Sequence, residues 1–152
     1  MISVLLTICG GFLLAVLWMD LMFDVQVCPR ARRECALPEE VLASIAAYYR
    51  RVTTTASPMG HLVGAVMAIT VIGSVFEIVD GVKSRWLTLA SSAFAGGPIA
   101  LAIVRVLPNA VRLGAREDST ATQSALARSI CGDHLLCFAG ILAFVALRLA
   151  AR

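Results

Sequence analysis

The chain has 152 residues, of which 59% are hydrophobic and only 15% charged, and its mean hydropathy is +0.86. Soluble domains are about 45–50% apolar and about 25% charged, so this composition excludes an ordinary soluble globule and a disordered tail. A formal net charge of +3 is too small and too scattered for a surface that follows phosphates, which excludes a nucleic-acid-binding module. The composition predicts an integral membrane protein.

Four apolar stretches are long enough to cross the hydrocarbon layer, which takes about 20 residues of helix. They cover residues 2–24, 58–79, 86–107 and 129–150. The first stretch has neither a basic leader nor a small-residue cleavage pattern, so a cleaved signal peptide is not expected. The predicted fold class is all-α: a four-helix transmembrane bundle that forms one domain over residues 1–152.

The connection between the first two stretches is the longest and contains a helical pattern of its own. Glu39 and Glu40 follow Pro38, at the end of a helix where negative charge suits the dipole. Apolar residues then recur at the spacing of one helical face, at Val41, Leu42, Ile45, Tyr48, Tyr49 and Val52. We predict an amphipathic helix over residues 38–53, lying on the membrane or packed against the mouth of the bundle.

Basic residues near the ends of the spans predict the orientation. The side with the first and third connections carries Arg30, Arg32, Arg33, Arg50, Arg51, Arg112, Arg116 and Arg128. The opposite side carries Lys83, Arg85, Arg148 and Arg152. Because cytoplasmic connections are enriched in Lys and Arg, we predict a multi-pass protein of a bacterial-type inner membrane with both termini outside the cytosol.

The five cysteines give a weak signal. Cys28 and Cys35 share the first connection, where a cytosolic location keeps thiols reduced, and their spacing differs from that of a zinc knuckle. In the inverted orientation, a disulfide between them becomes plausible. Cys9, Cys131 and Cys137 lie within predicted helices, where a buried cysteine usually acts as a small hydrophobic residue.

Ionisable side chains within apolar spans are costly, which makes each of them a candidate functional residue. All four spans carry such groups near the end that lies on the same side of the membrane as the first connection. The candidate catalytic residues are Asp20, Asp24, His61, Arg105, Asp133 and His134, and the candidate ligand-binding residues are Asn109, Trp18, Tyr48 and Tyr49. Their convergence on one leaflet is the strongest functional signal in the sequence.

A purely structural role for these ionisable residues explains the convergence equally well. Each residue lies close enough to a helix end to reach the membrane interface, and Asp20 can pair with Arg105 to fix which helices touch. Asp133 near the start of the last span also suits the helix dipole.

Three kinds of chemistry fit a functional role. His61, His134, Asp20 and Asp24 offer nitrogen and carboxylate ligands for a metal ion, although Asp133 and His134 point about 100° apart on a helix. His61 and His134 could also clamp a haem, so the cofactor remains unknown. The third chemistry uses an aspartate–histidine pair as a general base beside Arg105, acting on a lipid-soluble substrate.

The other leaflet carries a smaller group of charges. Glu77 and Asp80 end the second span on one face, with Lys83 and Arg85 just beyond. A charged interfacial turn is the expected reading, and a site for proton or cation uptake is the alternative.

Small residues predict where helices approach closely. Gly60 and Gly64 form a G-x-x-x-G pattern, continued by Ala68, which predicts contact with a neighbouring helix and burial of the adjacent His61. Pro98 interrupts the third span and predicts a kink near the bilayer centre. Gly10 and Gly11 of the first span are expected to meet it.

The organisation of the chain resembles that of small anthrone-oxygenase-like membrane proteins. The resemblance rests on four spans, a long first connection with Tyr48-Tyr-Arg-Arg51, and a second span that begins with proline. It concerns the layout alone and implies no activity for this chain.

Three classes of function remain open. The leading expectation is a protein that binds a hydrophobic small molecule or a membrane partner, such as a second copy of this chain, within the lipid bilayer. The alternatives are a membrane-embedded enzyme that uses the polar cluster and an oligomeric transporter or channel.

Overall fold

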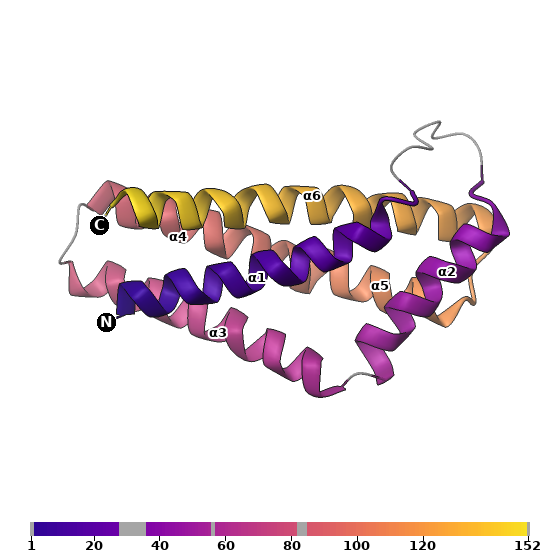
Figure 1. Cartoon of the computed structure of the whole chain (residues 1–152), viewed down its shortest axis with the longest axis horizontal. Coiled ribbons are helices and arrows are strands. Elements are labelled where there is room, and N and C mark those ends of the chain that lie inside the picture. Colours follow the sequence, from indigo (N-terminus) through magenta and orange to yellow (C-terminus); the bar gives the residue numbers. More distant parts are fainter. Residues whose placement is uncertain (1, 28–35, 56, 82–84, 152) are drawn as a thin grey trace.

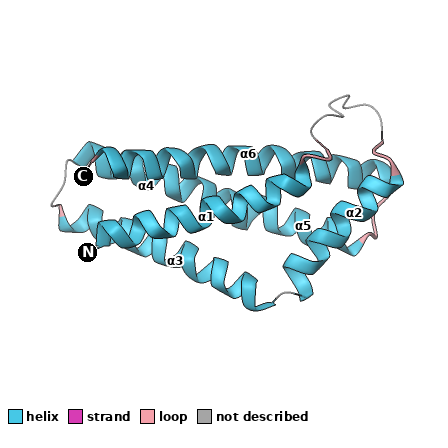
Figure 2. Cartoon of the chain, in the orientation of Figure 1, coloured by secondary structure: helices cyan, strands magenta, loops and turns pink. Residues whose placement is uncertain are grey.

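The structure, a computed structural model, describes residues 2–27, 36–55, 57–81 and 85–151. Within these ranges every regular element is a helix (Figure 2). Four of the described helical segments are long and apolar enough to cross a membrane, which agrees with the predicted helical bundle and with a multi-pass membrane protein. The placement of the bundle in a bilayer stays a prediction.

Helices α1 (Ile2–Asp24), α3 (Ser57–Asp80) and α6 (Thr120–Ala150) each form one candidate membrane span. The third segment is composite, because α4 (Arg85–Leu101) continues through a π-helical stretch, η2 (Ala102–Val106), into α5 (Leu107–Ala115). Both termini lie at one end of the molecule, and α2 (Glu39–Arg50) crosses the opposite end (Figure 1). A second π-helical stretch, η1 (Arg51–Thr55), follows α2.

The third and fourth spans extend further than their apolar cores predict. Helix α6 begins at Thr120 because the side chain of Ser119 caps it by accepting a hydrogen bond from the Thr122 amide. One face of the polar first turns of α6 is buried: Ser124 is 1% exposed, and its hydroxyl accepts a hydrogen bond from the Leu37 amide at 2.9 Å. The expected twenty-residue polar loop is therefore largely helix.

Helix α2 packs against the bundle through one buried face. Leu42, Ile45 and Tyr49 of α2 join the core formed with α5 and α6. A side chain on Gly114 of α5 would lie 2.9 Å from the backbone nitrogen of Arg50, so α5 and the end of α2 are in close contact. Of the two predicted placements, packing against the mouth of the bundle is the one observed, and contact of α2 with the membrane stays a prediction.

The long helices cross at small residues, but at other positions than expected. Pro98 of α4 meets Gly140 of α6, where an added Cβ would lie 2.5 Å from the proline ring. Gly10 packs against Val145 of α6 rather than near Pro98, so the predicted meeting of Gly10 and Pro98 is wrong. The reason is that Pro98 packs against α6 at Gly140, whereas Gly10 contacts α6 at Val145.

Candidate ligand-binding pocket

A cluster of polar side chains gathers where α1, α2 and α6 meet. Asp20 and Asp24 lie one turn apart on α1, and each accepts a hydrogen bond of 2.6 Å from a tyrosine of α2. Tyr48 donates to Asp20, and Tyr49 donates to Asp24. His134 of α6 completes the group, which we call the head cluster.

Asp24 and His134 form a buried pair inside the head cluster. Nδ1 of His134 lies 2.7 Å from Oδ2 of Asp24, and these residues are 4% and 0% exposed. An ionised carboxylate only accepts hydrogen bonds, so Nδ1 carries the proton. Nε2 of the imidazole then faces Oδ2 of Asp20 across 3.9 Å. Asp24 thus fixes the orientation of the histidine, as the carboxylate does in a catalytic dyad.

The two tyrosines of the head cluster are also the only two in the chain. Burial, followed by the charge of Asp24, raises the pKa of Tyr49 far above its ordinary value of 10.0. Burial and the charge of Asp20 raise the pKa of Tyr48 in the same direction. Tyr48 is held from the other side by Phe23, whose ring stacks on it with centroids 3.9 Å apart. Both phenols therefore remain hydrogen-bond donors.

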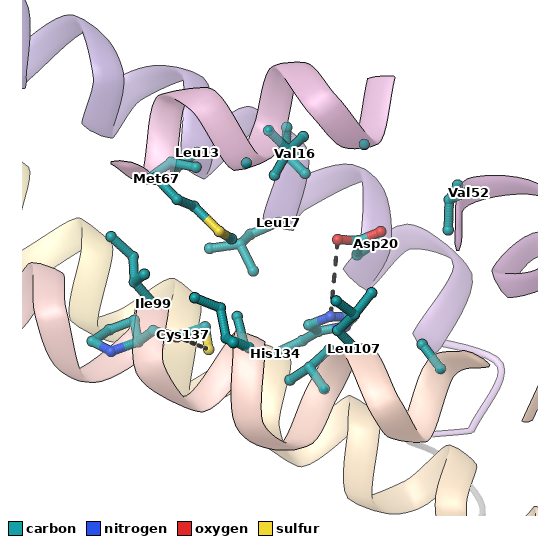
Figure 3. A pocket seen from close by; sticks show the side chains of 18 of the residues that line it. Leu13, Val16, Leu17, Asp20, Val52, Met67, Ile99, Leu107, His134 and Cys137 are labelled. Carbon is teal, nitrogen blue, oxygen red and sulfur yellow. Dashed lines mark hydrogen bonds and ion pairs between the residues drawn. The ribbon is translucent and has the colours of Figure 1, made fainter. Parts of the chain in front are cut away.

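The head cluster closes one end of a pocket of about 840 Å³. This volume lies within the range of small-molecule sites, about 300–1,000 Å³. The walls are almost entirely apolar and come from α1, α3, α4, η2, α5 and α6. Figure 3 shows Asp20 and His134 facing each other at this end, with Leu17, Met67 and Ile99 further along the pocket.

The pocket opens sideways between α3 and the third span. Met59 and Ile72 of α3 line it and are 54% and 68% exposed, and Ile103 and Leu107 on the opposite wall are 55% and 50% exposed. In Figure 1, the first half of α3 diverges from the other long helices on this side.

Arg105 and Asp133 form a separate group. Nε of Arg105 lies 3.3 Å from Oδ2 of Asp133, and its Nη2 donates to the hydroxyl of Ser129 at 3.1 Å. The alternative that Asp20 pairs with Arg105 is therefore wrong, because Asp133 neutralises the arginine and Tyr48 binds Asp20. Asp133 and His134 point to different partners, as their adjacent positions predict.

The other candidate residues lie outside the pocket walls. His61, Asn109 and Trp18 do not line the pocket, and His61 is exposed, so its predicted burial is wrong. Asp20, Asp24 and His134 come together without it. The described residues contain no group of three or more His, Cys, Asp and Glu side chains arranged to hold a metal ion. The expected metal site of His61, His134, Asp20 and Asp24 is therefore not formed by these residues.

At the other end of the bundle, Glu77 of α3 pairs with a residue of α6. Arg148 of α6 donates two hydrogen bonds to its carboxylate, at 2.8 and 2.7 Å. The side chains are 5% and 11% exposed for Arg148 and Glu77. Lys83 lies outside the described residues, as do Cys28 and Cys35. Glu77 is thus part of a buried bridge between α3 and α6, which favours a structural role over cation uptake.

Two features of the pocket were not predicted as such. Gly60 and Gly64 line it, and a Cβ on either would meet nothing within 4 Å, so their G-x-x-x-G pattern opens space instead of seating another helix of this chain. Cys137, expected only as a small buried residue, lines the pocket, with Sγ 3.5 Å from the carbonyl oxygen of Pro98. Its position three residues after His134 is the sequence signal that could have indicated its place in the pocket wall.

Comparison with protein-family models, curated proteins and solved structures gives no match. The resemblance in layout to anthrone-oxygenase-like proteins therefore stays a prediction.

Proposed function

We propose that this protein binds a hydrophobic small molecule that carries one polar group. The observation that carries the proposal is the pocket of about 840 Å³ with apolar walls and the head cluster at one end. Sites of this kind hold the apolar body of a ligand by burial and use a few polar groups to orient it. The sideways opening gives a lipid-soluble molecule a path from the bilayer.

A point substitution that fills the pocket tests this proposal. Gly64→Leu places a side chain in the pocket without a clash, because a Cβ at Gly64 meets nothing within 4 Å. Gly11→Leu is the matched control, since Gly11 is exposed, has the same free space and does not line the pocket. Saturable binding of tritiated dodecanol is measured on phosphatidylcholine nanodiscs, with empty nanodiscs as background.

We expect Gly64→Leu to bind dodecanol at least tenfold more weakly than wild type. Gly11→Leu is expected to bind dodecanol with the affinity of wild type. Equal binding by Gly64→Leu and wild type would place the probe elsewhere on the protein. Equal melting temperatures of the three proteins separate a blocked pocket from a misfolded one.

A second candidate function is a membrane-embedded enzyme, and the Asp24–His134 pair favours it. A histidine oriented through Nδ1 by a buried carboxylate presents Nε2 as a proton acceptor, and His134 lines the pocket. The test compares organic extracts of cells that express wild type or His134→Gln. A lipid-soluble compound consumed only in the presence of wild type supports catalysis. Identical extracts from the two strains leave binding as the better account.

A membrane partner is the competing occupant of the same face. A helix from a second copy of this chain that seats on Gly60 and Gly64 would fill the opening by the usual packing of small residues. The mass of the protein in nanodiscs distinguishes the two: a monomer that binds dodecanol supports the small molecule, and a dimer broken by Gly64→Leu supports the partner.

A further inference from the structure

The charged, hydrogen-bonding and aromatic groups at the polar end of the pocket define a ligand class, and this inference rests on the proposed binding function. We propose that the pocket takes a primary ammonium group on an apolar body, with the ammonium between Asp20 and His134. Charge, hydrogen-bonding capacity and aromatic surface each support this assignment.

The charge of the pocket favours a cation. Among the described residues that line it, Asp20 is the acidic one and none is Lys or Arg. Asp24 adds a second carboxylate just behind His134. Arg105 of η2 is engaged by Asp133. A carboxylate or phosphate on the ligand would meet like charge in a medium of low dielectric, whereas an ammonium would meet opposite charge.

The hydrogen-bonding capacity favours a donor with at least two N–H bonds. Oδ1 of Asp20 already accepts from Tyr48, but Oδ2 faces Nε2 of His134 at 3.9 Å, beyond hydrogen-bond distance. When the imidazole is neutral and its proton is on Nδ1 toward Asp24, Nε2 is a hydrogen-bond acceptor. In this protonation state, two acceptors face each other across 3.9 Å at the end of the pocket.

A primary ammonium satisfies both acceptors at once. One N–H donates to Oδ2 of Asp20 and another to Nε2 of His134, which turns an acceptor–acceptor contact into two hydrogen bonds, one of them charge-assisted. A hydroxyl brings one donor and no charge, and a quaternary ammonium brings charge and no donor. The rings of Tyr48 and Tyr49, which also line the pocket, add surfaces that attract a cation.

Four probes with the same twelve-carbon chain isolate the head group: dodecylamine, dodecyltrimethylammonium, dodecanol and dodecanoate. Tritiated dodecylamine is bound to the protein in phosphatidylcholine nanodiscs at pH 7.5, where an alkylamine is protonated, and the unlabelled probes compete. We expect dodecylamine to compete at least tenfold better than each of the others, since a hydrogen bond to a charged group is worth about ten- to a hundredfold. Dodecanoate is expected to compete least.

The matched variants are Asp20→Asn and Asp80→Asn. The amide introduced by Asp20→Asn keeps an acceptor for Tyr48 but removes the charge, so we expect about a tenfold or larger loss of dodecylamine affinity, which exceeds any loss of dodecanol affinity. Asp80 is exposed and does not line the pocket, so Asp80→Asn is expected to bind like wild type. Added phosphatidylethanolamine then identifies the source: competition by this lipid assigns the ammonium to a headgroup, and no competition assigns it to a free amine.

The outcomes separate the two proposals. Dodecanol that competes as well as dodecylamine, with both blocked by Gly64→Leu, would overturn the ammonium assignment and leave the proposed function standing. Equal dodecylamine affinity of Asp20→Asn and wild type would overturn the assignment as well. Failure of all four probes to bind would overturn the proposed function itself.

Discussion

Tyr48 and Tyr49 make the head cluster visible in solution, because the chain has no other tyrosine. Burial and the neighbouring carboxylates raise the pKa of both phenols above the ordinary value of 10.0. We therefore predict that tyrosinate absorbance at 295 nm stays absent from the folded protein at pH 10–11, where exposed tyrosines ionise.

The same shift predicts how stability depends on pH. The unfolded chain releases the two phenolic protons near pH 10 and the folded chain retains them, so the free energy of unfolding falls as pH rises above about 10. Below pH 10 this contribution is fully present. Chemical unfolding at pH 8, 9.5 and 11 measures it, and Tyr48→Phe with Tyr49→Phe is the control. A tyrosinate signal at pH 10 while near-UV circular dichroism stays native would contradict the buried donor role.

Arg148 and Glu77 test the structural role of a charge pair at the other end. Because both side chains are nearly buried, removing one partner leaves the other charge in an apolar environment, and we predict that Arg148→Met lowers the free energy of unfolding by about 3–5 kcal/mol. Adding Glu77→Gln to Arg148→Met removes the remaining charge and is expected to restore part of the loss. Unfolding of detergent-solubilised protein in sodium dodecyl sulfate gives the values.

The exposed pair of Arg112 and Asp118 is the matched control. Its arginine side chain is 59% exposed, so solvent screens the interaction and Arg112→Met is expected to change stability little. A role of Glu77 in proton or cation uptake predicts the opposite result. In that case Glu77→Gln would abolish uptake while leaving the free energy of unfolding close to that of wild type.

At the scale of the elements, the crossing of α4 and α6 depends on Gly140. An added Cβ would lie 2.5 Å from the ring of Pro98, and the fixed pyrrolidine cannot rotate away. We predict that Gly140→Ala lowers the free energy of unfolding by about 1–3 kcal/mol, the usual cost of overpacking, despite the better helix propensity of alanine. Gly132→Ala on the same helix has free space and is expected to be neutral or stabilising. Equal stability of Gly140→Ala and Gly132→Ala would show that the crossing can relax.

The number and order of the four candidate membrane spans follow from the sequence, but the ends of the helices do not. Long apolar stretches predict spanning helices because the backbone must satisfy its own hydrogen bonds in lipid. The polar first turns of α6 were expected in a loop, since hydropathy does not register that Ser124 bonds to the backbone of Leu37. The π-helical stretch η2, which joins α4 to α5, likewise has no pattern that periodicity alone detects.

The head cluster was predictable in part. The spacing of Asp20 and Asp24 places them on one face of a helix, and their depth matches that of His134. Their hydrogen bonds to Tyr48 and Tyr49 depend on how α2 folds back over the bundle, which is a tertiary feature. His61 has the right depth and chemistry but faces outward, and the sequence contains no signal that distinguishes it from His134.

At the scale of the whole molecule, polar residues are concentrated at the two ends and the pocket belongs to one of them. Helix α2 and the two termini lie at opposite ends of the molecule (Figure 1). The head cluster and the pocket include residues of α2, whereas the Glu77–Arg148 bridge joins the last turns of α3 and α6. This asymmetry makes the orientation of the chain important for the proposed function, because the orientation would determine which leaflet supplies the proposed ligand.

The distribution of basic residues predicts that the α2 end is cytosolic. The connections on that side carry twice as many Lys and Arg as the opposite side, and Arg148, counted on the poorer side, is engaged by Glu77, which strengthens the bias. Reporter fusions after residues 80 and 152 should give active alkaline phosphatase, which needs an oxidising exterior. Fusions of green fluorescent protein after residues 37 and 117 should fluoresce. The reverse pattern would place the head cluster at the outer leaflet, so the ligand would be drawn from outside the cell.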